Sequence, residues 1–157
     1  RDMLGRLRPI GLEEFGLAAA INNLVEFWRR RNPEILYAVA VGRDIDSFGE
    51  AIDLVIYRIV QEGLSNAARH GQPTHVSVSI AHEPSRAGET AAIMVRVSDD
   101  GGGIDADAAL GYGLLGMTER VRTVGGRLAI DNKPGQGLAV TAILPWHARD
   151  TVETSPT

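Results

Sequence analysis

The most informative segment of the chain is Tyr57-Arg-Ile-Val-Gln-Glu-Gly-Leu-Ser-Asn-Ala-Ala-Arg-His-Gly71. It lies within residues 50–70, where apolar side chains recur at intervals of three and four residues. That interval is the period of an α-helix, and no proline interrupts it. Gly71 tolerates a left-handed backbone and is soon followed by Pro73, which cannot continue a helix. We therefore predict one long helix that ends at His70.

Polar side chains fall on the apolar face of this helix. At about 100° per residue, Glu62, Asn66 and His70 lie within roughly 80° of one another, on the arc of Val55 and Ile59. An unpaired buried carboxylate costs several kcal/mol, which is more than helix propensity can offset. Glu62 and Asn66 therefore need partners. These are either an internal hydrogen-bond network in the core or a ligand or metal site at its edge.

Composition narrows the class of protein. The chain has 157 residues, of which 44% are hydrophobic, and this suits one domain with a substantial core. Its formal net charge is −4 without a dense cluster of basic residues, so we expect no nucleic-acid-binding surface. The absence of cysteine excludes disulfides and thiolate metal sites and fits a reducing compartment. No apolar run is long enough to span a membrane, and no signal peptide is visible.

The segment before the central helix predicts a second helix, over residues 12–31. The chain begins without methionine, so residues 1–11 are interpreted as a linker from a preceding domain. Asn32-Pro33 forces a turn before a short strand over residues 37–41. The side chains of the second helix that we expect to face inward are Leu12, Phe15, Ala19, Leu24, Phe27 and Trp28.

Strands in two pairs follow the central helix. The expected elements are strands over 75–81, 91–98, 127–131 and 138–144 and a helix over 114–124. Alternating apolar and polar side chains in the first pair indicate one buried and one open face. The order predicts an α+β two-layer sandwich, with a mixed and mostly antiparallel sheet covered by helices on one face. Residues 12–146 would form this domain, and residues 147–157 a flexible polar tail.

A second polar motif is Asp99-Asp-Gly-Gly-Gly103. The alternation of Ile93, Val95 and Val97 places Asp99 on the inward side at the end of its strand. Such a carboxylate, beside glycines that let backbone approach a ligand, can accept a hydrogen bond from an amine such as that of adenine. A simple Asp-Gly turn is the alternative, because such turns are common.

A third motif is Gly111-Tyr-Gly-Leu-Leu-Gly-Met117, which leads into a helix. Glycines before a helix N-terminus offer free N–H groups, which suit a phosphate. The pattern also matches GxGxxG, and Asp131 follows at the spacing of a dinucleotide-binding fingerprint. That fingerprint requires a strand running directly into the first glycine, whereas residues 104–110 read as a loop or a helical turn.

The order of these motifs resembles the GHKL family of ATP-binding domains (the Bergerat fold), which comprises gyrase, heat-shock chaperone ATPases, histidine kinases and MutL-type repair proteins. The motifs are Glu62…Asn66, Asp99-x-Gly101-x-Gly103, Gly111-x-Gly113 and Gly135-x-Gly137. Residues 57–71 are similar to the N box of sensor histidine kinases that pair with LuxR/NarL-type response regulators. Residues 7–31 resemble the segment joining their phosphoacceptor helices to the ATP domain. The resemblance covers residues 7–145.

The resemblance implies a site for ATP and Mg²⁺. Asn66 would hold the Mg²⁺ that bridges the ATP phosphates, which suits an ion with oxygen ligands. Glu62 matches the water-activating base of the family's ATPases, and in a kinase it would orient hydrated Mg²⁺ or assist proton removal from the attacking imidazole. Asp99 would recognise the adenine amine. The other implied nucleotide-binding positions are Arg69 and His70 near the phosphates, Gly101 and Gly103 near the base, and Gly111, Gly113, Leu114, Gly116 and Met117 at the lid of residues 104–110.

Two features depart from the family pattern. Relatives often carry Gly-Thr where this chain has Gly137-Leu138, so a hydroxyl that supports the adenine pocket is missing. None of the histidines lies in a phosphoacceptor motif; they are His70, His75, His82 and His147. The fragment is therefore expected to bind ATP without phosphorylating itself on histidine.

The resemblance implies the ATP-binding catalytic domain of a sensor histidine kinase. Its partners would be its own dimerisation and phosphoacceptor domain and a LuxR/NarL-type response regulator, with no nucleic-acid or membrane contact by this domain. A cytoplasmic location is expected, whether or not the parent protein is anchored in a membrane. Two alternatives remain: an ATP-gated interaction module, such as an anti-sigma serine kinase or a degenerate pseudokinase, and a dinucleotide-binding oxidoreductase.

Overall fold

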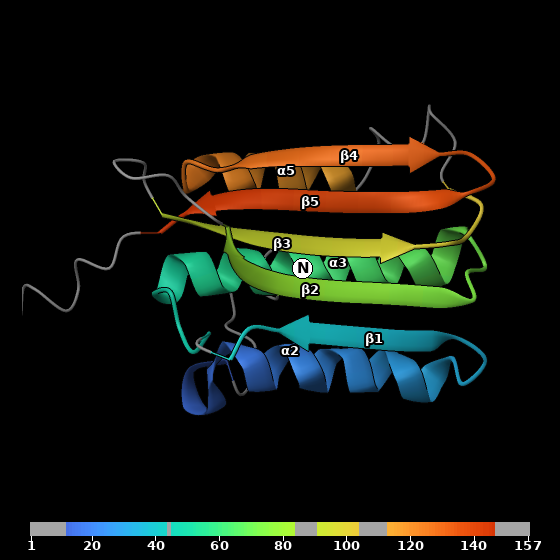
Figure 1. Cartoon of the computed structure of the whole chain (residues 1–157), viewed down its shortest axis with the longest axis horizontal. Helices are drawn as coiled ribbons and strands as arrows, with labels where there is room; N and C mark the ends of the chain where they lie inside the picture. The colour runs from blue at the N-terminus through green and yellow to red at the C-terminus, as the bar shows by residue number, and fades with distance from the viewer. Residues whose placement is uncertain (1–11, 44, 84–90, 104–112, 147–157) are drawn as a thin grey trace, which may run out of the picture.

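A computed structural model describes residues 12–43, 45–83, 91–103 and 113–146, without the side chains of Glu13, Glu14 and His70 (Figure 1). The elements are α2 (Leu12–Arg31), β1 (Leu36–Val41), α3 (Glu50–His70), β2 (His75–Glu83), β3 (Ala92–Asp99), α5 (Gly113–Thr123), β4 (Arg127–Lys133) and β5 (Gly137–Pro145). The predicted helices and strands are all present, and most bounds shift by one or two residues. The proposed linker, lid and tail lie outside the described residues.

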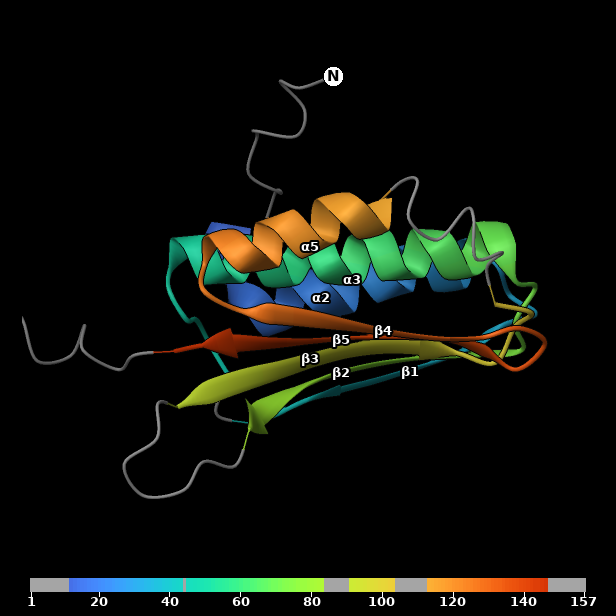
Figure 2. The same ribbon diagram turned by 90° about the horizontal axis from the view of Figure 1, so that it is seen from above.

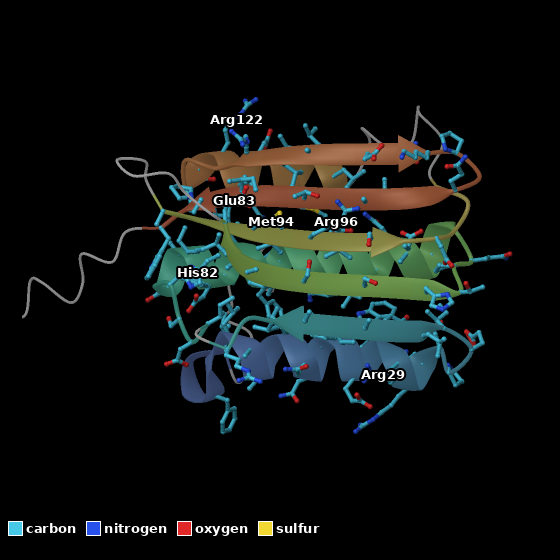
Figure 3. The ribbon with its side chains drawn as sticks, in the orientation of Figure 1. Arg29, His82, Glu83, Met94, Arg96 and Arg122 are labelled. Carbon is cyan, nitrogen blue, oxygen red and sulfur yellow. The ribbon has the colours of Figure 1, made fainter. Side chains whose placement is uncertain are left out.

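The five strands form one sheet in the order β1-β2-β3-β5-β4. β1 and β2 are parallel, and the other neighbouring pairs are antiparallel. The helices α2, α3 and α5 lie side by side on one face of the sheet (Figure 2). Figure 3 looks onto the other face, where Met94 and Arg96 project from β3. The predicted α+β two-layer sandwich is therefore confirmed.

The core lies between the sheet and the helices, with α3 at its centre. On β3, Ile93, Val95 and Val97 are buried and alternate with more exposed side chains, as predicted. Helix α3 approaches this strand closely because Gly63 has no side chain. A Cβ at Gly63 would lie 2.7 Å from the Cγ1 atom of Val97, closer than carbon atoms can pack.

Helix α2 corrects one prediction. Gly16 interrupts the helix with φ 86° and ψ 169°, so the residues on either side do not follow one continuous periodicity. Phe15 is 65% exposed and Phe27 is 47% exposed, so the expectation that both face inward is wrong. Leu12 and Leu24 are buried as predicted, and Leu17, Ala20, Ile21 and Val25 complete the buried face beyond the kink.

Among the described residues, no helix combines the length and hydropathy that crossing a bilayer requires.

Candidate functional site

Three segments that are distant in the sequence meet at one end of the molecule, on the right in Figure 1: the end of α3, the end of β3 and the β4–β5 turn. Gly102 joins them through its backbone. Its N–H donates to the carbonyl of Gly71 at 2.9 Å, and its carbonyl accepts from the N–H of Gly135 at 2.8 Å. The fold therefore brings the central-helix motif and the Asp99–Gly103 motif together, as the resemblance implies.

The glycines at this junction allow backbone segments to touch. A Cβ at Gly101 would lie 2.6 Å from the carbonyl oxygen of Gly71, and one at Gly103 would lie 2.7 Å from Oδ1 of Asn132. Gly137 has a φ of 127°, and its Cβ would lie 2.0 Å from the carbonyl oxygen of Asp99. No other residue fits at Gly101 and Gly137 without moving the backbone, and at Gly103 the positive φ of 76° favours glycine.

The end of α3 differs from the prediction in its detail. Gly71 has φ −139° and ψ −12°, whereas the next residue, Gln72, takes the left-handed conformation with φ 48°. Glycine at position 71 is therefore explained by tight packing and not by a left-handed cap. A Cβ there would lie 3.2 Å from the backbone nitrogen of Gly102 and 3.3 Å from Cα of Gly101.

Asp99 lies at the end of β3, and its half-buried side chain accepts hydrogen bonds from nearby backbone. Its Oδ1 accepts from the N–H of Gly101 at 2.9 Å. Burial raises the pKa of the Asp99 carboxyl, and hydrogen bonds from the N–H groups of Gly101 and Leu138 oppose that rise. Leu138 is buried and donates its backbone N–H to this carboxyl group. Such a carboxylate can also accept a hydrogen bond from a ligand amine.

Glu62 and Asn66 flank the guanidinium of Arg69. The Nη2 atom of Arg69 lies 3.5 Å from Oε2 of Glu62 and 3.4 Å from Oδ1 of Asn66, which are long, weak contacts. Asn66 is buried, but the side chain of Glu62 is 31% exposed, so the prediction of a buried carboxylate is wrong. Glu62 lies at the edge of the core, where its carboxylate faces both Arg69 and solvent.

The start of α5 lies against the Glu62 carboxylate. A Cβ at Gly113 would lie 2.1 Å from Cδ of Glu62, so the carboxylate occupies space that any other residue would fill. Leu114 and Met117 are buried and anchor this helix in the core. A Cβ at Gly116 would meet nothing within 4 Å, so no close approach explains that glycine.

The remaining predicted positions lie outside the described residues. They are Gly111, the side chain of His70 and the lid, residues 104–110. Sequence reasoning also assigned no role to Asp100, which binds the turn before β2. The signal was present, because consecutive carboxylates at a strand end project to opposite faces.

The side-chain oxygens of Asn66 and Glu62 are suitable ligands for a Mg²⁺ ion that is also bound by phosphate groups. In the part of the chain that the structure describes, no group of three or more His, Cys, Asp or Glu side chains could hold a metal ion. A magnesium ion bound with a nucleotide needs only one or two protein ligands, because phosphates and water supply the rest. The amide of Asn66 and the carboxylate of Glu62, both within 3.5 Å of Arg69 Nη2, provide suitable oxygens.

The sequence profile of the family described as histidine kinase-, DNA gyrase B- and HSP90-like ATPases matches residues 51–148. The chain belongs to this family. The match includes α3, the Asp99 motif and the last strands, which are the segments that build the site.

Two similar proteins carry names of histidine kinases. An uncharacterized sensor-like histidine kinase of Chloroflexus aurantiacus is 32% identical over 154 residues, covering 92% of this chain and 25% of that protein. The signal transduction histidine-protein kinase/phosphatase UhpB of Salmonella typhimurium is 31% identical over 142 residues, covering 90% of this chain and 27% of that protein. This chain thus spans about a quarter of the length of these two relatives.

Solved structures confirm the fold. The histidine kinase domain of a blue-light-activated kinase from Erythrobacter litoralis has a TM-score of 0.67 and 21% identity, covering 90% of this chain and 66% of that one. The mycobacterial sensor histidine kinase MprB has a TM-score of 0.64 and 22% identity, covering 84% of this chain and 95% of that one. The prediction of a GHKL-type ATP-binding catalytic domain, like those of sensor histidine kinases, is confirmed. The dinucleotide-binding interpretation is not supported.

Proposed function

We propose that this chain binds ATP with Mg²⁺ and delivers the γ-phosphoryl group to a histidine on a separate dimerisation and phosphoacceptor domain. One observation carries the proposal: the half-buried carboxylate of Asp99 lies at the junction with the helix that bears Glu62 and Asn66. Membership of an ATPase family and similarity to sensor kinases over most of the chain support it.

Each part of the site has a role in this proposal. Asp99 accepts a hydrogen bond from the adenine amine, and Gly101 and Gly103 let the segments around it pack closely. Asn66 would hold Mg²⁺, which neutralises phosphate charge when it is bound. Glu62 would orient water bound to that ion or assist deprotonation of the incoming imidazole, and Arg69 would lie near the phosphates. Phosphoryl transfer depends mainly on such positioning and charge neutralisation.

The partners belong to the same proposal. The histidine would come from the parent protein's dimerisation domain, and the phosphoryl group would pass on to a LuxR/NarL-type response regulator. This pairing rests on the similarity of residues 57–71 to the N box of that kinase branch. A cytoplasmic location follows, because ATP is the substrate.

Transfer of labelled phosphate tests the proposal. The chain is incubated with γ-labelled ATP and Mg²⁺, alone and with the phosphoacceptor domain of its parent protein. The chain alone should acquire no stable acid-labile phosphate, whereas the added domain should acquire acid-labile phosphohistidine. Asn66→Ala, which removes the proposed metal ligand, should abolish this transfer.

Other outcomes would contradict the proposal. Acid-labile phosphate on the chain alone would show that it contains its own acceptor. Acid-stable phosphate on a serine of a partner would favour the anti-sigma serine kinase alternative. ATP binding without transfer to the supplied histidine domain would favour a pseudokinase.

A further inference from the structure

The carboxylate of Asp100 is hydrogen-bonded to the turn that precedes β2. Its Oδ1 accepts from the backbone N–H of Thr74 at 2.8 Å and from that of His75 at 2.9 Å. Its Oδ2 accepts from the hydroxyl of Thr74 at 2.5 Å and lies 3.3 Å from Nδ1 of His75. Hydrogen bonds to a charged acceptor are shorter and stronger than those between neutral groups. We call this set of contacts the Asp100 clamp.

The Asp100 clamp lies where the β3 ladder stops. Asp99 is the last residue of β3 that pairs with a neighbouring strand, opposite Val76 on one side and Leu138 on the other. Beyond Asp99, the N–H of Asp100 donates to the carbonyl of His75 at 3.2 Å. The carboxylate of Asp100 binds the same turn through the N–H groups of Thr74 and His75. Both the backbone N–H and the side chain of Asp100 are hydrogen-bonded to residues 74 and 75. These bonds restrict rotation of the backbone that orients Asp99.

The turn before β2 is also hydrogen-bonded to Gly102, which follows Asp100 in the chain. Gly71 begins the turn, and its carbonyl accepts from the N–H of Gly102 at 2.9 Å. Gln72 then holds a left-handed φ of 48°, which is uncommon for a residue with a side chain. Residues 71–75 therefore connect the end of α3 to both sides of Asp99, with the Asp100 clamp on one side and Gly102 on the other.

We propose that Asp100 is a positioning residue for base recognition: anchored on Thr74 and His75, it holds Asp99 in the orientation that accepts the adenine amine. The proposal rests on the proposed ATP site. Successive strand side chains project to opposite faces, so Asp100 acts through Asp99 without touching the base. Its loss should therefore reduce discrimination between bases, with little effect on binding of the phosphates.

Base discrimination provides the test. The affinity of the full chain is measured for ATP and for inosine triphosphate, whose base carries a carbonyl in place of the amine. The wild type should prefer ATP. Asp100→Ala should lower this preference about tenfold, as expected for the loss of about one hydrogen bond at Asp99. Asp100→Asn should keep most of the preference, because an amide oxygen can accept from the same backbone N–H groups.

A matched control is Asp131→Ala. Asp131 is also an exposed carboxylate on the sheet, and it lies 3.8 Å from Lys133. This variant should leave the ratio of the two affinities unchanged. If Asp100→Ala is not folded by circular dichroism, Thr74→Ala and Thr74→Ser provide the test, because serine alone restores the hydroxyl that contacts Oδ2.

The outcomes separate this inference from the proposed function. A wild type that binds neither nucleotide, or both equally, would refute the ATP site itself. A wild type that prefers ATP, with the same preference in folded Asp100→Ala, would refute the positioning role and leave the ATP site intact. Equal weakening of both nucleotides would also refute it, because a general structural role predicts that result.

Discussion

At the residue scale, two neighbouring carboxylates at the end of β3 have opposite properties. Burial raises the pKa of Asp99, whereas hydrogen bonds led by that from the hydroxyl of Thr74 lower the pKa of Asp100 well below its usual range. The difference arises from the strand, which sends one side chain inward and the next outward. Asp99 is thus the carboxylate available to a base, and Asp100 the one attached to the protein.

Replacing Asp99 tests its proposed contact with adenine. Asp99→Ala should weaken ATP binding by about 1.5–3 kcal/mol, the scale of a hydrogen bond to a charged group. This corresponds to roughly ten- to a hundredfold in the dissociation constant, measured by titration calorimetry. Affinity for inosine triphosphate should change much less. Unchanged ATP affinity would exclude Asp99 from the adenine site.

Asp53 stabilises the loop before α3. It is buried, and its carboxylate accepts from the hydroxyl of Ser47 at 2.6 Å and from the backbone N–H of Phe48 at 2.9 Å. Asp53→Ala leaves the buried N–H of Phe48 without its acceptor, so the free energy of unfolding should fall by about 1–3 kcal/mol. Asp53→Asn keeps an oxygen acceptor and should lose less. Urea denaturation at neutral pH measures both changes.

The wild type and Asp53→Asn should also differ in how their free energies of unfolding depend on pH. Burial raises the pKa of Asp53 above its ordinary value of 3.8. The stability associated with its protonation is fully present below pH 3.8 and is lost as pH rises through the raised pKa. The stability of the wild type relative to Asp53→Asn should therefore increase as pH falls from neutral. Parallel stability curves for the two proteins would refute this.

At the element scale, α3 both fills the core and carries Glu62 and Asn66. Its close contact with β3 depends on Gly63, although glycine is a poor helix former. The helix therefore gives up some intrinsic stability in order to lie against Val97. Asn66 lies about one helical turn after Gly63. The close packing at Gly63 therefore helps to fix the distance between the Asn66 side chain and the sheet.

Gly63→Ala should destabilise the domain. Its Cβ would lie 2.7–3.1 Å from three atoms of Val97, a stiff β-branched side chain. The overpacking should cost about 1–3 kcal/mol, more than the gain of about 1 kcal/mol in helix propensity. Val97→Ala removes the two Cγ atoms and leaves only the Cβ of residue 97 at 2.9 Å, so Gly63→Ala should cost much less in that background. A double-mutant cycle measures this coupling, and additive effects would refute the packing argument.

At the scale of the whole molecule, the site exists only where the ends of α3, β3 and the β4–β5 turn meet. The opposite end is held separately, by the rings of Phe48, His82 and Trp146, whose centroids lie 5.3–5.8 Å apart. A nucleotide that contacts both α3 and the Asp99 motif would bind the folded state and not the unfolded chain. Ligand binding should therefore be linked to global stability.

ATP with Mg²⁺ should raise the melting temperature. At a ligand concentration about one hundred times the dissociation constant, linkage predicts a gain of about 2.7 kcal/mol. For a domain of this size the midpoint should rise by about 5–10 °C. Calorimetry or thermal fluorescence measures the shift. Asp99→Ala at the same ATP concentration should lose most of it, and an equal shift in that variant would contradict the proposed site.

The helices and strands could be predicted from local patterns in the chain, and so could the inward position of Asp99. Helical periodicity identified α3 to its last residue, and alternation along β3 placed Asp99 inward. These are local patterns, and a repeat of two or 3.6 residues can be read without knowing the neighbours. The kink at Gly16 could not be predicted from such patterns, because glycine occurs both within helices and at breaks in them.

Which segments come together depended on how the helices and strands pack. The strand order, the contact of Gly71 with Gly101 and the bond of Asp100 to Thr74 all join residues far apart in the sequence. No periodicity encodes such contacts, because they depend on how whole surfaces pack and on which backbone groups remain unpaired at the ends of the elements. Gly71 illustrates the difference: the sequence marked a helix end there, and only packing against Gly101 explains why the residue is glycine.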